Sequence, residues 1–119
     1  ITPDLSEEVR RRLIEAAGAC GIPVLERGVY WQTGGPRLET RAEIRMMAAH
    51  ADIVGMTMAA EAIIARELGL SYAALCSVDN YCNGVVETPL TMETILEGAK
   101  RNRETMMTIV GTFIERSRA

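Results

Sequence analysis

The sequence predicts an α/β fold with a largely parallel sheet flanked by helices. Segments of helical periodicity alternate along the chain with short segments rich in β-branched residues, which is the order expected for parallel strands joined by helices. The clearest example is Ile53-Val54-Gly55, which passes directly into a helical pattern containing Ile63, Ile64 and Leu68. The residues between them lie at the carboxyl end of the strand, where open α/β sheets bind ligands.

The composition is that of an ordinary globular chain and argues against several classes of protein. The 119 residues suffice for one domain or less with a modest core; 48% are hydrophobic and 24% charged. A net charge of −3 with both signs interspersed does not favour nucleic acid or an acidic membrane, and no apolar run is long enough for a membrane helix. Three cysteines and one histidine argue against a disulfide framework or a zinc site, so we expect a cytoplasmic protein without a metal.

The amino-terminal part predicts a helix followed by an extended segment. Asp4 or Ser6 can cap the helix, whose apolar residues recur at helical spacing until Gly21 ends it. Residues 24–33 alternate in polarity, which predicts a strand or a short hairpin around Glu26-Arg27-Gly28.

The next elements carry clear start and stop patterns. Gly34-Gly35-Pro36 stops the extended segment, and Thr40-Arg41-Ala42-Glu43 is a capping box that begins a helix expected to reach about Ala51. The strand at Ile53-Val54-Gly55 follows, and then a helix that ends at Gly69.

The carboxyl-terminal part predicts a third strand and a long closing helix. Ser71–Val78 is apolar with few charges, which fits a strand buried on both faces with Cys76 in the core, and Asp79–Gly84 is the polar loop after it. Thr91 caps the last helix. The apolar face expected on this helix comprises Met92, Ile95, Leu96, Ala99, Met106, Val110 and Phe113.

Three loops are expected to meet at one edge of the sheet, because each follows a predicted parallel strand: Gly34–Glu39, Met56-Thr57 and Asp79–Cys82. Glu39 offers a carboxylate and Asn80 an amide, a pair that suits a ligand edge with N–H donors and a carbonyl, such as a purine base. The alternatives are a solvated loop charge or a contact to a helix start for Glu39, and turn chemistry for Asn80.

Met56 and Thr57 face the amino end of a predicted helix, where unpaired backbone N–H groups favour an anion. The Thr57 hydroxyl can bind a phosphate oxygen, and the Met56 thioether can cover an apolar ligand face. The alternative is that Thr57 only caps the helix and Met56 only fills the core.

A series of short motifs runs in a fixed order along most of the chain. They are Tyr30, Gly35-Pro36-Arg37-Leu38-Glu39-Thr40-Arg41-Ala42-Glu43, Ala51-Asp52-Ile53-Val54-Gly55-Met56-Thr57, Glu61, Ala65-Arg66-Glu67-Leu68-Gly69-Leu70, Tyr72-Ala73 and Asn80-Tyr81. This series resembles the trimeric purine nucleoside phosphorylases and methylthioadenosine phosphorylases.

The resemblance implies a three-layer fold with a mixed, largely parallel, twisted sheet, of which residues 1–119 form the carboxyl-terminal half of one domain. It implies a pentosyltransferase of purine salvage that cleaves purine nucleosides with inorganic phosphate to free base and ribose 1-phosphate, without a cofactor. It further implies a homotrimer or a dimer of trimers. The amino-terminal half, with its Gly-rich phosphate loop, is absent from the sequence, so we expect the isolated chain to be inactive.

The resemblance also implies roles for individual residues. Met56 matches the methionine beneath the ribose, and Thr57 matches the hydroxyl that contacts phosphate. Leu38 occupies the place where many members stack an aromatic ring on the base. Glu39 and Asn80 match the pair that holds a 6-oxopurine, with Glu39 on the N1–H edge and Asn80, the catalytic group, at O6 and N7.

Two further positions bear on the substrate. Adenine-selective relatives have an Asp opposite Asn80 and a second Asp opposite Cys82, so the resemblance favours hypoxanthine or guanine. Met92 falls where nucleoside-specific members have a histidine on the 5′-hydroxyl, which makes 5′-methylthioinosine a candidate substrate. The alternatives are a non-catalytic purine-binding or assembly fragment and a nucleosidase that uses water.

Overall fold

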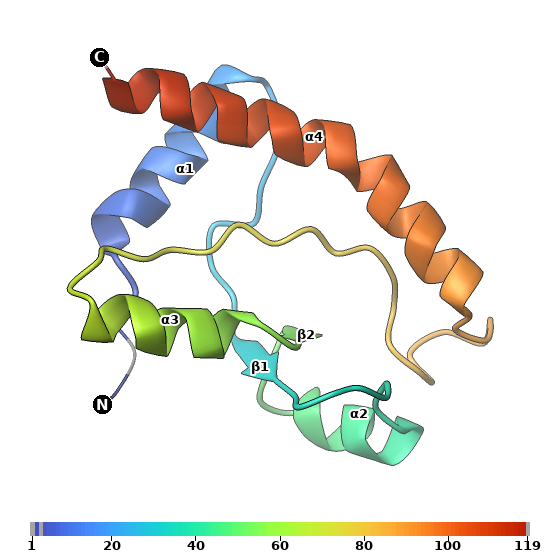
Figure 1. The fold of residues 1–119 in the computed structure, drawn as a ribbon. Helices are drawn as coiled ribbons and strands as arrows, with labels where there is room; N and C mark the ends of the chain where they lie inside the picture. The colour runs from blue at the N-terminus through green and yellow to red at the C-terminus, as the bar shows by residue number, and fades with distance from the viewer. Residues whose placement is uncertain (1, 3, 119) are drawn as a thin grey trace. The chain divides into compact units, whose positions relative to one another are not determined.

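The computed structural model describes residues 2 and 4–118, and its strands alternate with helices (Figure 1). In chain order the elements are α1 (Glu7–Ala19), β1 (Tyr30–Gln32), α2 (Arg41–Met47), β2 (Ile53–Gly55), α3 (Met58–Glu67) and α4 (Met92–Arg118). The two strands are parallel, which confirms the predicted α/β class.

The chain divides into two compact units. Unit 1 comprises Ile1–Glu26, Thr57–Cys76 and Arg103–Ala119. Unit 2 comprises Arg27–Met56 and Ser77–Asn102.

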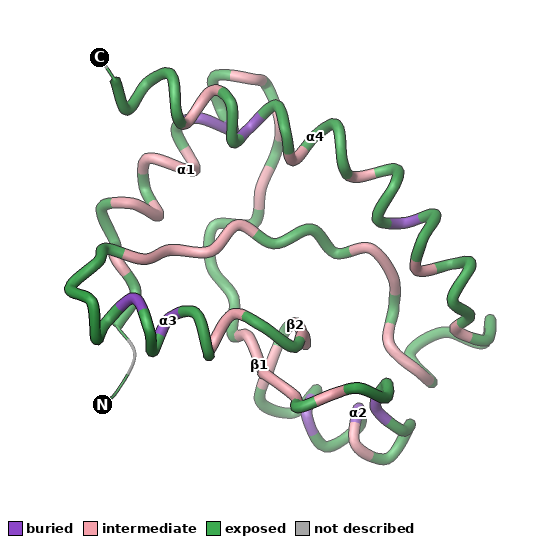
Figure 2. Tube along the Cα trace, in the orientation of Figure 1, coloured by how far each residue is buried: buried purple, intermediate pink, exposed green. Residues whose placement is uncertain are grey.

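The core of unit 1 lies where α1 meets the carboxyl-terminal part of α4 (Figure 2). Ala16 and Ala17 expose 0% of their surface and Ile109 exposes 2%. The two alanines form a flat surface without long side chains, on which the branched side chain of Ile109 packs. The partly buried apolar side chains around this contact are Ile22, Val24, Leu75 and Phe113.

Helix α1 begins and ends at the residues that local chemistry predicts. Ser6, rather than Asp4, is the cap: its hydroxyl accepts a hydrogen bond from the Val9 N–H at 3.2 Å. At the other end Gly21 has a φ of 68°, its N–H donates to the Gly18 carbonyl, and the Ile22 N–H donates to the Ala17 carbonyl. This paired arrangement is a Schellman motif, which satisfies the last carbonyls of the helix.

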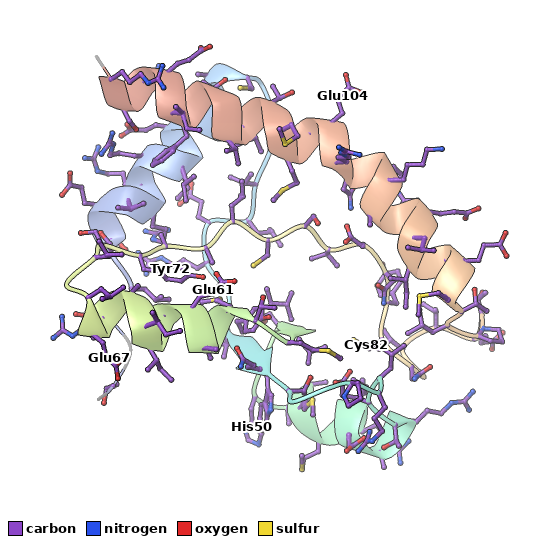
Figure 3. The ribbon with its side chains drawn as sticks, viewed as in Figure 1. His50, Glu61, Glu67, Tyr72, Cys82 and Glu104 are labelled. Carbon is purple, nitrogen blue, oxygen red and sulfur yellow. The ribbon has the colours of Figure 1, made fainter. Side chains whose placement is uncertain are left out.

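Helix α3 is held in unit 1 by its alanine face and by the segment that follows it. Ala62 and Ala65 are buried; the helix ends at Glu67, and Gly69, with a φ of 67°, stops its continuation. The Tyr72 hydroxyl then donates a hydrogen bond to Glu61 Oε2 at 2.7 Å (Figure 3). Glu61 therefore has a structural partner in addition to its favourable charge in the first helical turn.

Unit 2 is built on the pairing of β1 with β2 and on α2, which connects them. Tyr30 lies opposite Ile53 and Gln32 opposite Gly55. Helix α2 starts with the predicted capping box, in which Thr40 and Glu43 exchange side-chain and backbone hydrogen bonds. It ends at Met47 and continues as a turn, so the expected end near Ala51 was about one turn too late.

Of two predicted extended elements, the first is confirmed in part, as the strand β1, and the second is wrong. No hairpin forms around residues 26–28, since only Tyr30–Gln32 of this segment pairs with another strand. Ser71–Val78 is not a strand within the described part of the chain, Cys76 is exposed rather than in the core, and Val78 is 62% exposed. Apolar composition indicates a tendency to be covered, whereas a strand requires a neighbouring backbone with which to form hydrogen bonds.

The inward face of α4 is also different from the predicted one. Ile95, Met106 and Phe113 are partly buried as expected, but Gly98 and Ile109 are the buried residues. The predicted positions Met92, Leu96, Ala99 and Val110 are exposed. The helix has more than one apolar stripe, and periodicity alone could not reveal that a glycine lies on the inward one.

Helix α4 begins as predicted. Thr91 Oγ1 accepts a hydrogen bond from the Thr94 N–H at 3.2 Å, and the Ile95 N–H donates to the Thr91 carbonyl. Among residues 2 and 4–118, no helix combines the length and apolar character needed to span a lipid bilayer.

Two glycines three residues apart provide a matched test of the α1 terminus. Gly21→Ala is expected to lower the free energy of unfolding by about 1 kcal/mol, because alanine is disfavoured at a left-handed φ. Gly18→Ala, inside the helix with no atom within 4 Å of the added methyl group, is expected to raise it by up to about 1 kcal/mol. Urea unfolding of the full-length protein measures both, and equal shifts of the same sign would contradict this account.

Candidate functional site

Two of the three predicted loops start at the same edge of the sheet in unit 2. Gln32 and Gly55 are partners at the carboxyl ends of β1 and β2, and the Thr33 N–H donates to the Gly55 carbonyl at 2.9 Å. The Gly34–Glu39 loop follows β1, and Met56 follows β2. Parallel pairing therefore brings these two chain segments side by side, as the sequence predicts.

Met56 contacts the glycine-rich loop directly. A Cβ atom at Gly35 would lie 2.9 Å from Met56 Sδ, so the thioether packs on the backbone of this residue. Met56 is 38% exposed and is therefore not simply a core residue. A neighbouring side chain of the same unit therefore lies against the backbone of the Gly34–Glu39 loop.

Glu39 is the only charged or polar residue classed as buried in the part of the chain that the structure describes, with 8% of its surface exposed. It immediately precedes Thr40, the cap of α2. Its other neighbour, Leu38, is 42% exposed. The burial contradicts the alternative in which Glu39 is a solvated surface charge. An ionised carboxylate in such a place needs hydrogen-bond donors or nearby positive charge.

The third loop meets Glu39. Asn83 Nδ2 donates a hydrogen bond to the Glu39 carbonyl oxygen at 2.9 Å. Burial raises the pKa of the Cys82 thiol, and the negative charge of Glu39 raises it further. Asn83 was not predicted as a functional residue; its only sequence pattern is the turn dipeptide Asn83-Gly84.

Asn80 combines a local turn contact with a place beside a cavity. Its side chain is half-buried, and Nδ2 donates to the Tyr81 carbonyl at 3.0 Å, which is the kind of bond that the turn alternative predicts. The cavity has a volume of about 540 Å³. It is lined by Val78, Asp79, Asn80, Tyr81, Val86, Thr88, Pro89, Leu90, Thr94 and Arg101.

The cavity contains one of the predicted site residues, Asn80, whereas Glu39, Met56 and Cys82 do not line it. The structure therefore joins the loops pairwise, through Gly35 with Met56 and through Asn83 with the Glu39 carbonyl, rather than around a single closed pocket. Arg101, on α4, supplies a positive charge to the cavity and was missed, because its position in the sequence resembles an ordinary exposed helix face.

The remaining predicted residues have separate surroundings. Met92 is the first residue of α4 and is 67% exposed. Thr57 belongs to unit 1 and is the N-cap residue of α3 by position, but its side chain does not form the capping hydrogen bond that the simple alternative predicts. Within the described residues, no three His, Cys, Asp or Glu side chains are grouped in a way that could hold a metal ion.

Arg37 and Glu43 close the loop that carries Glu39. Arg37 Nη1 donates to Glu43 Oε2 at 2.9 Å and Nη2 donates to Oε1 at 2.8 Å, while the Thr40 N–H and hydroxyl also donate to Oε2. The hydrogen bonds from Arg37, followed by those from Thr40, lower the pKa of Glu43 to about 2. Arg37 is thus occupied by this ion pair.

The ion pair gives the protein a defined sensitivity to acid. Because the pKa of Glu43 falls from 4.5 to about 2 on folding, its contribution to stability is present above pH 4.5 and is lost as the pH falls toward 2. Glu43→Gln is expected to make the free energy of unfolding decline less steeply over this range, as measured by urea unfolding at successive pH values. Arg37→Gln should have the same effect, since it raises the pKa of Glu43; unchanged slopes would contradict the assignment.

Comparison with known proteins gives a consistent result. A sequence model of a family described as the Phosphorylase superfamily matches residues 2–115. A probable 6-oxopurine nucleoside phosphorylase of Archaeoglobus fulgidus is 46% identical over 117 residues, which are 98% of this chain and 48% of that protein. A probable S-methyl-5′-thioinosine phosphorylase of Thermodesulfovibrio yellowstonii is 42% identical over 97 residues, which are 81% of this chain and 37% of that protein.

A solved structure has a similar fold. The chain is similar to methylthioadenosine phosphorylase from Schistosoma mansoni in complex with adenine, with a TM-score of 0.89 and 27% identity. The match covers 97% of this chain and 46% of that one. The chain thus spans about half the length, or less, of the proteins that it matches.

Proposed function

The chain belongs to the Phosphorylase superfamily, and on this basis we propose that the protein containing it cleaves the N-glycosidic bond of purine nucleosides with inorganic phosphate. The products are the free base and ribose 1-phosphate, or its methylthio derivative, which makes the protein a pentosyltransferase of purine salvage. The chain supplies the carboxyl-terminal half of the catalytic domain, and the activity belongs to the complete protein.

The observation that carries the proposal is the buried carboxylate of Glu39 beside the loop that bears Asn80. Glu39 is 8% exposed, and its backbone carbonyl is held by Asn83, three residues after Asn80. A carboxylate that is shielded from water is a strong acceptor for the N1–H of a 6-oxopurine. The side-chain amide of Asn80, three residues before Asn83 in the same loop, is suited to the O6 and N7 edge of that base.

Asn80 is the group through which the chain acts on the reaction. When the bond between ribose and base breaks, positive charge develops on the sugar and negative charge on the purine. Phosphate stabilises the first, and hydrogen bonds from the Asn80 amide at O6 and N7 stabilise the second. Removal of one such donor typically lowers the rate by about 10²–10³.

The other predicted residues complete the substrate contacts. Met56, held on Gly35, lies beneath the ribose, and Leu38 contacts the base without aromatic stacking. Thr57 contacts phosphate at the amino end of α3, where the backbone N–H groups and the helix dipole favour an anion. Inorganic phosphate is a co-substrate, and the reaction uses no metal or other cofactor.

The base is proposed to be hypoxanthine or guanine. The pKa of Cys82 is raised by burial and by Glu39, so this thiol is neutral at physiological pH, whereas an aspartate here would carry a charge suited to an amino group. The relatives that match the chain include proteins named for 6-oxopurine, thioinosine and thioadenosine substrates. Met92 is proposed to contact the 5′ position, where a thioether suits an apolar methylthio group.

The remaining proposals concern assembly and location. We propose a homotrimer or a dimer of trimers, by analogy with the trimeric enzymes whose motifs the chain shares. We place it in the cytoplasm, which the odd number of cysteines and their lack of disulfide partners fit. Gel filtration with light scattering of the full-length protein measures the oligomeric state.

The function is tested by an assay of the full-length protein on inosine, 5′-methylthioinosine and adenosine, each with and without phosphate. We expect release of hypoxanthine that depends on phosphate, with formation of ribose 1-phosphate or its methylthio derivative. Release without phosphate would indicate a nucleosidase, and binding of purine without any release would indicate a non-catalytic module. Cleavage of adenosine alone would contradict the proposed base selectivity.

The role of Asn80 is tested by Asn80→Asp. An aspartate accepts a hydrogen bond from a 6-amino group and repels a 6-oxo group, so the ratio of kcat/KM for adenosine to that for inosine is expected to rise at least tenfold, or about 1.4 kcal/mol. The two substrates are measured on the same preparation, which removes any effect on the amount of folded protein. An unchanged ratio would exclude Asn80 from base recognition.

A further inference from the structure

The segment that leads into Asn80 is held by α4 within unit 2. Asn102 Nδ2 donates hydrogen bonds to the Val78 carbonyl at 3.2 Å and to Asp79 Oδ1 at 2.9 Å. The acceptors belong to Val78 and Asp79, the two residues before Asn80, and Asn102 is half-buried. One amide group thus fixes two consecutive residues.

Gly98, about one helical turn before Asn102 in α4, contacts the same segment. It is buried, and a Cβ atom added to it would overlap the Asp79 carbonyl oxygen and lie 2.7 Å from the carbonyl carbon. The Asp79 backbone therefore rests directly on α4, in a space that only glycine leaves open. Residues four apart lie on the same face of a helix, so Gly98 and Asn102 act on one surface.

We propose that Gly98 and Asn102 are positioning residues that fix Asn80 for contact with the base in the transition state. The inference rests on the proposed function. Asp79 is held through its carbonyl, its carboxylate and the preceding carbonyl, so the peptide that joins it to Asn80 has a defined orientation. A catalytic amide that is oriented in advance stabilises the charge of the leaving purine without reorganisation during the reaction.

The experiment compares inosine with 7-methylinosine in the full-length protein and its Asn102→Ala variant. 7-Methylinosine carries a positive charge on the purine, so its base leaves without needing a hydrogen bond at N7. Asn102→Ala is expected to lower kcat/KM for inosine by about 100-fold and that for 7-methylinosine by less than about threefold. A variant that had only lost stability would lose activity on both substrates equally.

A double-mutant cycle separates an action through Asn80 from an independent one. If Asn102 acts through Asn80, the double variant Asn80→Ala/Asn102→Ala is expected to be no slower on inosine than Asn80→Ala alone. Losses that multiply in the double variant would overturn the inference, as would equal losses of Asn102→Ala on both substrates.

Helix α4 itself offers a matched control. Gly98→Ala is expected to reproduce the selective loss on inosine, because the new methyl group displaces Asp79. Gly111→Ala, the same change in the same helix with no atom within 4 Å, is expected to leave both rates unchanged. Should Gly98→Ala fail to fold, as judged by circular dichroism, the Asn102 series alone decides. A wild-type protein without phosphorolytic activity would overturn the proposed function rather than this contact alone.

Discussion

The parallel pairing of β1 with β2 determines where the candidate site can form. Each strand has only three residues, yet their register places the loop that carries Glu39 beside Met56. Gly55, at the end of β2, lies under the Tyr30 hydroxyl group, and any larger residue there would displace the tyrosine ring. The backbone pairing and this contact together explain how a strand of only three residues that ends in glycine can stay aligned with β1.

Around this edge, the loops are connected by contacts that involve backbone atoms more than side-chain pairs. The Glu39 carbonyl accepts from Asn83, and the Asp79 carbonyl rests on Gly98. These contacts set the backbone positions of Glu39 and Asn80, and the Asn80 amide also donates to the Tyr81 carbonyl. The placement of a hydrogen-bonding group before the reaction is what the proposed contact between Asn80 and the base requires.

The elements that depend on local chemistry could be predicted from the sequence. The capping box at Thr40, the helix ends at Gly21 and Gly69 and the cap at Thr91 are decided by residues within one turn of each other. Ser71–Val78 could not be assigned in the same way, because the partner on which a strand depends is often far away in sequence.

The same distinction between local sequence and distant contacts applies to the residues of the candidate site. Glu39 and Asn80 could be chosen as candidates from the sequence because carboxylates and amides that follow predicted strands are typical of ligand sites; the structure adds that Glu39 is buried. Asn83, Gly98 and Asn102 could not be recognised, because their importance comes from contacts with residues that are 44, 19 and 23 positions away: Glu39 for the first and Asp79 for the others. Nothing in their own neighbourhoods distinguishes them from ordinary turn and helix residues.

The ion pair of Arg37 with Glu43 has a consequence for how base selectivity can change. Arg37 and Thr40 both bind the Glu43 carboxylate, so the two residues between them, Leu38 and Glu39, form a small ring closed by side-chain bonds. A substitution of the exposed Arg37 would open that ring and loosen the backbone that positions the buried residue Glu39, the proposed partner of the purine. Under the proposed function, natural variation at the protein surface would therefore alter which nucleoside is accepted without a change in any residue proposed to contact it.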